Sequence, residues 1–361
     1  MDTQRIIAFI VFSFSTLLLW ESWQTYNNPK PPVEIQATAT KSATQPASAE
    51  LPVPGQALKP IAPLNDAGKV ANGARARIIT DVLDAEIDAN GGDLRKLTLT
   101  RYRQNEQDEL PFELLEEKAG RNYFAQMGFV GGSLPTHKSV IELVPGEYRL
   151  KDGQNELKVS LKAVQNGTEI IRTYTFQRGS YVVDIDTKII NRGQTLIEGF
   201  PYYQLMRNGQ APEGESKLMQ SFTGPAVYTD VGKFQKISFE DITKGKAEFV
   251  KEAKDGWIGL VQHHVVSAWV TRDPADASAR EFYTRAIGND EFSAGMIFPV
   301  AKLNPGEEKT LSMRLYAGPQ ELEKIKILAP GLDLVVDYGW LKVIAYPIFV
   351  LLSWIHNLVQ N

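Results

Sequence analysis

The sequence predicts a mainly β protein with two large stacked antiparallel sheets, an N-terminal transmembrane helix and a C-terminal amphipathic helix. Three observations support this: short segments with a period of two dominate from about residue 74, one helical pattern follows the last of them, and an uncharged apolar run lies near each end. Strands with few helices between them favour antiparallel pairing, because parallel neighbours need long crossovers. A closed barrel is the alternative. The expected regions are an anchor (1–26), a tether (27–72), a β body (73–318), a short helix and linker (319–330) and an amphipathic helix (331–361).

Composition excludes several classes of protein. The 361 residues carry 39 Lys and Arg against 43 Asp and Glu, so no basic excess points to a nucleic-acid partner. Cysteine is absent, which rules out disulfides, a thiol nucleophile and cysteine-ligated metals. Only four histidines are present, so metal and acid–base chemistry have few candidate groups.

The N-terminus carries a membrane signal. The run Ile6–Trp20 is uncharged, and its flanks from Thr3 to Trp23 extend it to about the ~30 Å thickness of a hydrocarbon core. A cleaved signal peptide is the alternative, but the bulky polar residues after Trp20 do not form a small-residue cleavage site. The expected anchoring residues are Ile6, Ile7, Phe9, Ile10, Val11, Phe12, Leu17, Leu18, Leu19 and Trp20.

Charges around this run predict its orientation. Arg5 and the α-amino group precede it, Glu21 follows it, and no Lys or Arg appears again before Lys30. Positive charge remains on the cytoplasmic side of a span. The N-terminus is therefore expected in the cytoplasm and the rest of the chain across the inner membrane, which in a bacterium is the periplasm.

A tether is expected next. Eight of the twenty prolines lie between Pro29 and Pro63, mixed with Ala, Thr, Ser and Gln. This composition buries too little apolar surface to offset chain entropy, so it favours an extended, semi-rigid segment. A proline-rich docking ligand is the alternative.

Two patterns mark strands most clearly in the body. Asn166-Gly167 predicts a tight hairpin, because a type I′ turn needs positive φ at both central residues. Tyr181–Ile190 alternates apolar and polar residues. The expected strands are Val82–Asp88, Leu94–Tyr102, Glu156–Val164, Glu169–Phe176, Tyr181–Ile190, Glu198–Leu205, Lys233–Phe239, Trp257–Gln262, Val265–Thr271, Glu281–Ile287, Glu291–Val300 and Lys309–Tyr316.

The C-terminal part predicts two helices. Pro319–Leu328 is expected to be the only helix of the body, with proline in its first turn and acids before lysines. The uncharged run Val343–Ile355 is too short to span a bilayer and suits the membrane interface. A buried helix docked on the β body is the alternative. The expected interfacial residues are Trp340, Leu341, Ile344, Phe349, Leu352, Trp354 and Ile355.

No group of residues predicts catalysis, a cofactor or a metal. His263 and His264 are expected side by side on a strand with their rings on opposite faces, where they cannot readily share a metal. His137 is expected in a loop without a carboxylate motif nearby. Asp184 and Asp186 share a strand face, but Lys188 beside them favours a solvated face over a catalytic carboxylate pair.

Several strings resemble the Gram-negative type of the YidC family of bacterial membrane protein insertases. The opening MDTQRIIAFIVF and LLLWESW is similar to that family's first transmembrane helix. NGGDLRKLTL, PFELLEE, FQRGSYVVDID and GWIGLVQHHVVSAWV resemble its large periplasmic domain. The final LAPGLDLVVDYGWLKVIAYPIFVLLSWIHNLVQN resembles the junction between that domain and the insertase core.

The resemblance implies a mutarotase-like β-supersandwich and an interfacial helix from Val335 to Val359. It also implies a function: inserting, folding and assembling inner-membrane proteins, alone or with the Sec translocon and its auxiliary subunits, without a cofactor. Nascent inner-membrane proteins and the lipid bilayer are then partners, and nucleic acid is not. The family's later transmembrane helices and its groove arginine have no counterpart here, so the chain is expected to be the accessory N-terminal portion.

Two further hypotheses remain at this point. A membrane-tethered carbohydrate-binding or mutarotase-like module rests on fold analogy alone, which does not establish a function. A periplasmic scaffold that binds a partner through a sheet edge or a concave face is compatible with the insertase hypothesis.

Overall fold

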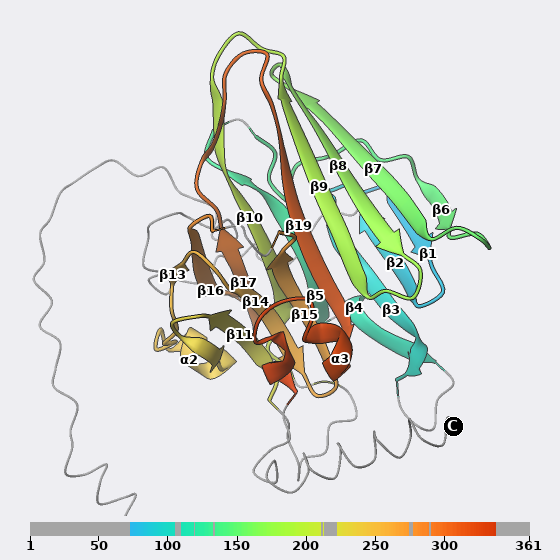
Figure 1. Cartoon of the computed structure of the whole chain (residues 1–361), viewed down its shortest axis with the longest axis vertical. Coiled ribbons are helices and arrows are strands. Elements are labelled where there is room, and N and C mark those ends of the chain that lie inside the picture. The colour runs from blue at the N-terminus through green and yellow to red at the C-terminus, as the bar shows by residue number, and fades with distance from the viewer. Residues whose placement is uncertain are drawn as a thin grey trace, which may run out of the picture. The chain divides into compact units, whose positions relative to one another are not determined.

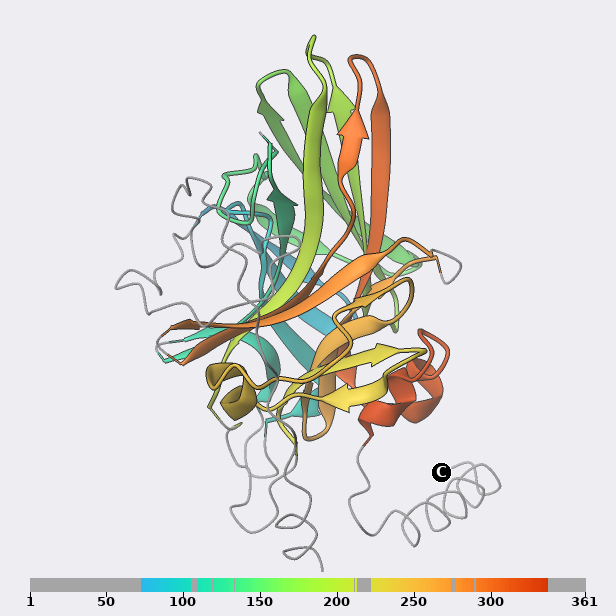
Figure 2. The same cartoon turned by 90° about the vertical axis from the view of Figure 1, so that its left-hand side faces the viewer.

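Two antiparallel sheets packed against each other make up the body, as Figure 1 and the perpendicular view in Figure 2 show. The computed structural model describes residues 73–336, apart from 105–109, 119, 133, 211, 213–221, 274–276 and 289. Among the described strands both sheets are open and end in edge strands, so the closed-barrel alternative is wrong. The predicted pair of stacked sheets is confirmed.

The larger sheet has eleven described strands in the order β13-β16-β17-β10-β5-β4-β3-β2-β1-β6, and β18 also pairs with β10. Its pairs are antiparallel except β1 with β6. Its strands are β1 (Arg75–Ile79), β2 (Leu83–Asp88), β3 (Leu94–Arg103), β4 (Pro111–Lys118), β5 (Arg121–Val130), β6 (Gly146–Arg149), β10 (Ile197–Asn208), β13 (Glu252–Ala253), β16 (Arg280–Gly288), β17 (Glu291–Ile297) and β18 (Ala301–Leu303).

The smaller sheet has eight described strands in the order β12-β11-β14-β15-β19-β9-β8-β7. All of its pairs are antiparallel. Its strands are β7 (Glu156–Gln165), β8 (Thr168–Gln177), β9 (Val182–Asn191), β11 (Gly224–Thr229), β12 (Lys233–Lys236), β14 (Trp257–Gln262), β15 (Val265–Thr271) and β19 (Glu308–Pro319).

Two apolar clusters lie between the sheets. The main core includes the fully buried Trp257 and Trp269, and Tyr203 packs on Trp269 with ring centroids 5.3 Å apart. A smaller cluster joins Phe129 and Leu303 of the larger sheet to Ile189 of the smaller one. Apolar area buried between two sheets is the main favourable contribution to folding in such a sandwich.

The predicted Asn166-Gly167 hairpin is confirmed. The two residues join β7 to β8 and have φ of 51° and 77°, as a type I′ turn requires. The alternating strand is also confirmed as β9, whose Val183 and Ile185 point into the core.

The helices differ in part from the prediction. Helix α3 (Leu322–Ile325) lies inside the expected Pro319–Leu328, but α2 (Phe239–Thr243) is a second helix in the body, so the expectation of only one was wrong. The strand expected to reach Phe239 ends at Lys236. Ser238 explains the change, because its side chain accepts a hydrogen bond from the Asp241 amide at 3.0 Å and begins α2 as an N-cap.

The described residues after α3, up to residue 336, pack against the β body. The 3-10 helix η1 (Leu332–Val335) buries Leu332 and Val335 in the main core. The expected anchor, the tether and the remainder of the expected interfacial helix lie outside the described residues. No helix in the described part of the chain has the length and apolar character needed to cross a bilayer.

Candidate functional site

The turn between β2 and β3 connects the two sheets. Gly91 and Gly92 both have a φ of 70°, a left-handed conformation that favours glycine. From β8 of the opposite sheet, the Arg172 guanidinium donates to the Gly91 carbonyl and the Tyr174 hydroxyl donates to the Gly92 carbonyl. Any Cβ on Gly91 would lie 2.2 Å from the carbonyl oxygen of His137, so the turn has no room for a side chain.

Asp88, at the end of β2, holds the start of this turn. Its carboxylate accepts the Asn90 amide at 2.8 Å and the Gly73 amide at 3.0 Å. Arg75 on β1 lies 3.2 Å from the same carboxylate. Asp88 is fully buried, and these three donors compensate for the loss of its hydration.

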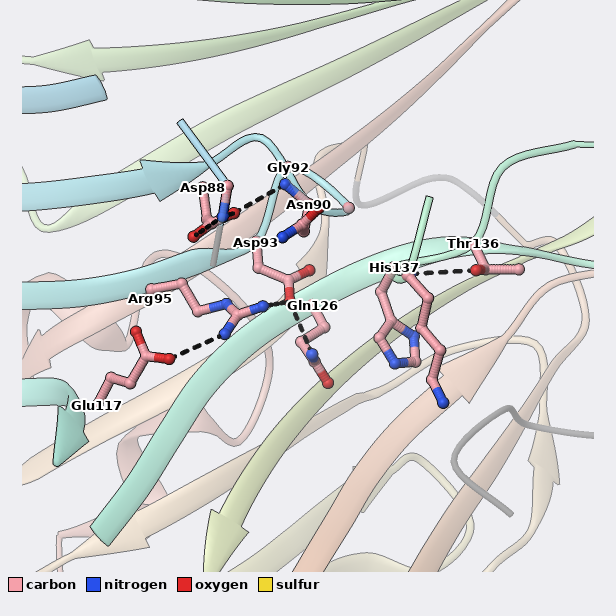
Figure 3. A network of polar contacts seen from close by, with 12 residues as sticks. Asp88, Asn90, Gly92, Asp93, Arg95, Glu117, Gln126, Thr136 and His137 are labelled. Atoms are coloured by element: carbon pink, nitrogen blue, oxygen red, sulfur yellow. Dashed lines mark hydrogen bonds and ion pairs between the residues drawn. The ribbon is translucent and has the colours of Figure 1, made fainter. Parts of the chain in front are cut away.

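Asp93 and Arg95 form a buried ion pair just after the turn (Figure 3). Arg95 Nη2 lies 3.3 Å from Asp93 Oδ2, and Arg95 Nη1 donates to Glu117 on β4 at 3.2 Å. Arg95 is the extra residue of a bulge, because Glu86 pairs with Lys96 while Ile87 pairs with Leu94. The bulge redirects the side chain, as bulges commonly do.

A row of polar side chains extends from Asp93 across the larger sheet. Gln126 on β5 donates to Asp93 at 2.7 Å, Gln204 on β10 donates to Gln126 at 2.9 Å, and Tyr283 on β16 donates to Gln204 at 2.8 Å. Gly295 on β17 lies between Tyr283 and Gln204 in register, and a Cβ there would be 2.5 Å from the Tyr283 hydroxyl oxygen. A glycine at this position therefore lets the hydroxyl reach across one strand.

This polar row lies on the face of the larger sheet that points away from the smaller sheet. On β5 and β10, Gln126 and Gln204 alternate with Ala125, Tyr203 and Leu205, which belong to the main core. Burial raises the pKa of Asp93 to about 7, against the opposing effects of the Arg95 and Arg172 charges and the Gln126 hydrogen bond. The row was missed in the sequence, although an acidic and a basic residue flanking Leu94 at the start of an apolar strand could have indicated it.

His137 is buried beside this network rather than available for chemistry. Its backbone amide donates to the Tyr202 hydroxyl at 3.0 Å, and its Nδ1 lies 2.5 Å from the same oxygen. Burial, with smaller effects from the charges of Lys138 and Arg95, lowers the pKa of His137 to about 3. The ring is therefore neutral at ordinary pH and fastens its loop to β10.

The other two histidines of the body contradict their prediction. His263 and His264 form the turn between β14 and β15 instead of lying on a strand, and their ring centroids are 3.6 Å apart. A tight turn does not alternate its side chains between two faces, which is why the argument from strand geometry failed. Among the described residues, no group of three or more His, Asp or Glu could hold a metal ion.

The two aspartates of β9 are paired rather than simply solvated. Asp184 is almost buried and accepts from Arg314 Nε at 3.0 Å, while Asp186 accepts from Arg272 Nη1 at 2.9 Å. Lys188, whose charge beside them favoured a solvated face, pairs with Glu308 at 2.9 Å. The solvated-face prediction was therefore wrong for Asp184. Each of these two carboxylates is paired with an arginine.

A cleft of about 790 Å³ lies in the described part of the body. Pro201 and Tyr203 of β10, Phe298 and the strand β19 line it. Leu311 packs on the smaller apolar cluster and Met313 belongs to the main core. Because both residues line the cleft, the cleft lies between the two clusters.

The residues predicted to meet the membrane lie outside the described part of the chain. This holds for the ten anchoring residues between Ile6 and Trp20 and for the seven interfacial residues between Trp340 and Ile355. Their roles remain predictions.

Relatives of this chain share one name. A "Membrane protein insertase YidC" of Thiobacillus denitrificans is 49% identical over 100% of this chain and 65% of its own length. The protein of the same name from Dechloromonas aromatica is 45% identical, also over 100% of this chain and 65% of its own length. This chain thus spans 65% of the length of these relatives.

Two solved structures are also similar in part. A galactose mutarotase related enzyme from Lactobacillus acidophilus matches 67% of this chain and 97% of its own with a TM-score of 0.41 at 11% identity. A putative aldose 1-epimerase from Escherichia coli matches 68% of this chain and 98% of its own with a TM-score of 0.40 at 11% identity. The assignment of the fold rests on the strand pairing of the body itself.

A family model gives the assignment directly. The model described as "YidC periplasmic domain" matches residues 75–351. This range begins at the first residue of β1 and includes every strand of both sheets. The chain belongs to the YidC periplasmic domain family.

Proposed function

We propose that this chain is the N-terminal portion of a membrane protein insertase, which inserts, folds and assembles inner-membrane proteins alone or with the Sec translocon. The family match over residues 75–351, together with relatives named insertase along the entire chain, carries this proposal. The body acts as a binding scaffold and not as an enzyme. The buried Asp93 and Asp184 are paired with arginines and the buried His137 is neutral, which fits that role.

A chimera tests the proposed activity. This chain would be joined to the remaining third of the Thiobacillus denitrificans relative, which it does not cover. In cells depleted of their own insertase, the chimera should restore insertion of a newly made inner-membrane protein, measured by protection of its periplasmic loops from protease. The chain alone should not restore insertion. A chimera that reaches the membrane folded but inactive would contradict the proposal.

The same proposal places the N-terminus in the cytoplasm and the β body in the periplasm, anchored to the inner membrane by residues 1–26. It also assigns the residues after Val336, up to 361, to an interfacial helix, with nascent inner-membrane proteins and Sec auxiliary subunits as partners. Support comes from the charge distribution around Ile6–Trp20 and from the family description.

Cysteine labelling tests the orientation cleanly because the chain contains no cysteine. Val231 lies in the turn between β11 and β12 and is 86% exposed, so Val231→Cys creates a single accessible thiol on the body. A membrane-impermeant maleimide should label it in cells whose outer membrane alone is permeabilised. The matched variant Thr3→Cys should react only after the inner membrane is lysed. The reverse pattern would overturn the proposed topology.

A further inference from the structure

Strand β19 extends beyond its neighbour β15. It pairs with β9 from Glu308 to Tyr316, whereas its pairing with β15 covers only Met313 to Pro319. Residues 308–312 therefore have a strand on one side and no described strand on the other, and in Figure 1 β19 runs on past the end of β15. A sheet edge of this kind presents main-chain groups that another extended chain can pair with.

The direction of each main-chain group along this segment follows from two hydrogen bonds. Asn191 donates to the Glu307 carbonyl at 2.9 Å and Ala317 donates to the Tyr181 carbonyl at 3.0 Å, so odd-numbered residues of β19 bond to the β9 side. In an antiparallel ladder the alternate residues face the other way. Thr310 and Ser312 thus direct their N–H and C=O groups to the free side, and both are exposed.

The cleft of about 790 Å³ lies along this free edge, since Thr310, Leu311 and Ser312 line it. Across from them stand Tyr203 and Phe298, whose rings meet edge to face with centroids 5.8 Å apart. An apolar wall therefore faces a hydrogen-bonding edge. This combination suits a chain that offers a main chain to one side and apolar side chains to the other.

One positive charge in the cleft is not matched by an ion pair within the described part of the chain. Lys309 lines the cleft and shares the strand face of Leu311 and Met313, by the period of two. The two other charged groups of the cleft both have interactions of their own: Arg272 is held by Asp186 at 2.9 Å, and Asp273 also has a partner. Charge complementarity thus favours an occupant that brings a carboxylate to Lys309.

We propose that this cleft binds an extended, apolar polypeptide segment carrying an acidic residue, which adds a strand to the free edge of β19. Main-chain groups of the segment pair with Thr310 and Ser312, an apolar side chain packs near Phe298, and a carboxylate meets Lys309. Successive outward-facing residues of a strand lie about 6.8 Å apart, a spacing that only another extended main chain matches repeatedly. The inference goes beyond the proposed insertase function and does not depend on it, because binding is measured on this chain alone.

The probe is a fluorescein-labelled ten-residue peptide of alternating threonine and valine with one central glutamate, titrated with the full chain by fluorescence anisotropy. Thr310→Pro removes an N–H that faces the free side without touching the β9 ladder, and proline is tolerated on a strand edge. It should raise the Kd about tenfold, in line with a lost main-chain hydrogen bond and a blocked edge. The matched variant Thr310→Val keeps the N–H and should bind as the unmodified chain does.

Charge reversal and the peptide main chain provide independent readouts. Lys309→Glu should reverse the preference between the glutamate peptide and the same peptide with lysine at its centre. A peptide N-methylated at alternate residues should lose binding. Circular dichroism and the thermal unfolding midpoint check that each variant keeps its fold.

Three results would overturn the inference. They are failure of the glutamate peptide to bind, equal binding by Thr310→Pro and Thr310→Val, and self-association of the chain that Thr310→Pro abolishes. The last result would assign the edge to a second copy of this chain. None of them bears on the chimera, which measures membrane insertion separately.

Discussion

Replacing Arg95 with alanine is expected to lower the free energy of unfolding by about 3–5 kcal/mol. The guanidinium is fully buried, pairs with Asp93 at 3.3 Å and Glu117 at 3.2 Å, and lies over the Phe124 ring at 4.7 Å. Its removal leaves the buried Asp93 without its charged partner, with the Gln126 hydrogen bond remaining, and opens a cavity against Phe124. Denaturant titration of the full chain, followed by tryptophan fluorescence, measures the change.

A surface pair provides the matched control for Arg95. Arg77 on β1 contacts Asp84 on β2 at 2.6 Å, but the Arg77 side chain is 51% exposed. Solvent screens such a pair, so Arg77→Ala should cost less than about 1 kcal/mol. If Arg95→Ala lowers the free energy of unfolding as little as Arg77→Ala does, then the buried ion pair of Asp93 and Arg95 contributes little to stability.

Replacing Trp257 with alanine is expected to lower the free energy of unfolding by about 3–5 kcal/mol. It should also loosen the packing of residues 328–336 at the C-terminal end of the body. The indole is fully buried, lies parallel to the Tyr228 ring and at a tilt to the Phe234 ring, and its Nε1 donates to the Pro330 carbonyl at 3.0 Å. This hydrogen bond fastens the segment after α3 to the smaller sheet. Hydrogen exchange should accordingly report faster amide exchange in residues 328–336 than in the intact chain.

Trp257→Phe separates packing from hydrogen bonding. Phenylalanine keeps most of the apolar ring but cannot donate to Pro330, so the expected cost is nearer to 1–2 kcal/mol, or about one lost hydrogen bond and a small cavity. Equal costs for the two Trp257 variants would show that packing of the ring contributes little. Unchanged exchange at Leu332 in Trp257→Ala would show that Trp257 does not hold η1.

Alternation of apolar and polar residues predicted β9 (Val182–Asn191), whose two faces meet different surroundings. β9 alternates because Val183 and Ile185 face the core while Asp184 and Asp186 face arginines on the outer side. In contrast, β5 (Arg121–Val130) was missed because it is buried on both faces from Tyr123 onward. A strand covered on both sides has no reason to alternate.

Short helices and strands were not predicted for another reason. Helix α2 has five residues, too few for a helical periodicity to appear, although Ser238 followed by Asp241 is a capping signal that was available. β1 and β6 have five and four residues, and their pairing to each other is parallel, which no local pattern encodes.

The candidate sites depend on neighbours that are distant in the sequence. The row from Asp93 to Tyr283 needs strands β3, β5, β10 and β16 to lie in one register, and that register is a property of the whole sheet. The free edge of β19 exists only because β15 ends at Thr271. The sequence indicates each strand, but only the assembled sheets show which strand stops short.

Arg172 and Tyr174 of the smaller sheet donate hydrogen bonds to the Gly91 and Gly92 carbonyls of the larger sheet. Local unfolding of one sheet at this point therefore requires local unfolding of the other. Neither layer can separate at this point without breaking hydrogen bonds that begin on one layer and end on the other. The body is therefore expected to lose its structure as a single cooperative unit, with the slowest-exchanging amides distributed over both layers. Such a body resists partial opening, which would otherwise expose the apolar surface between its two sheets.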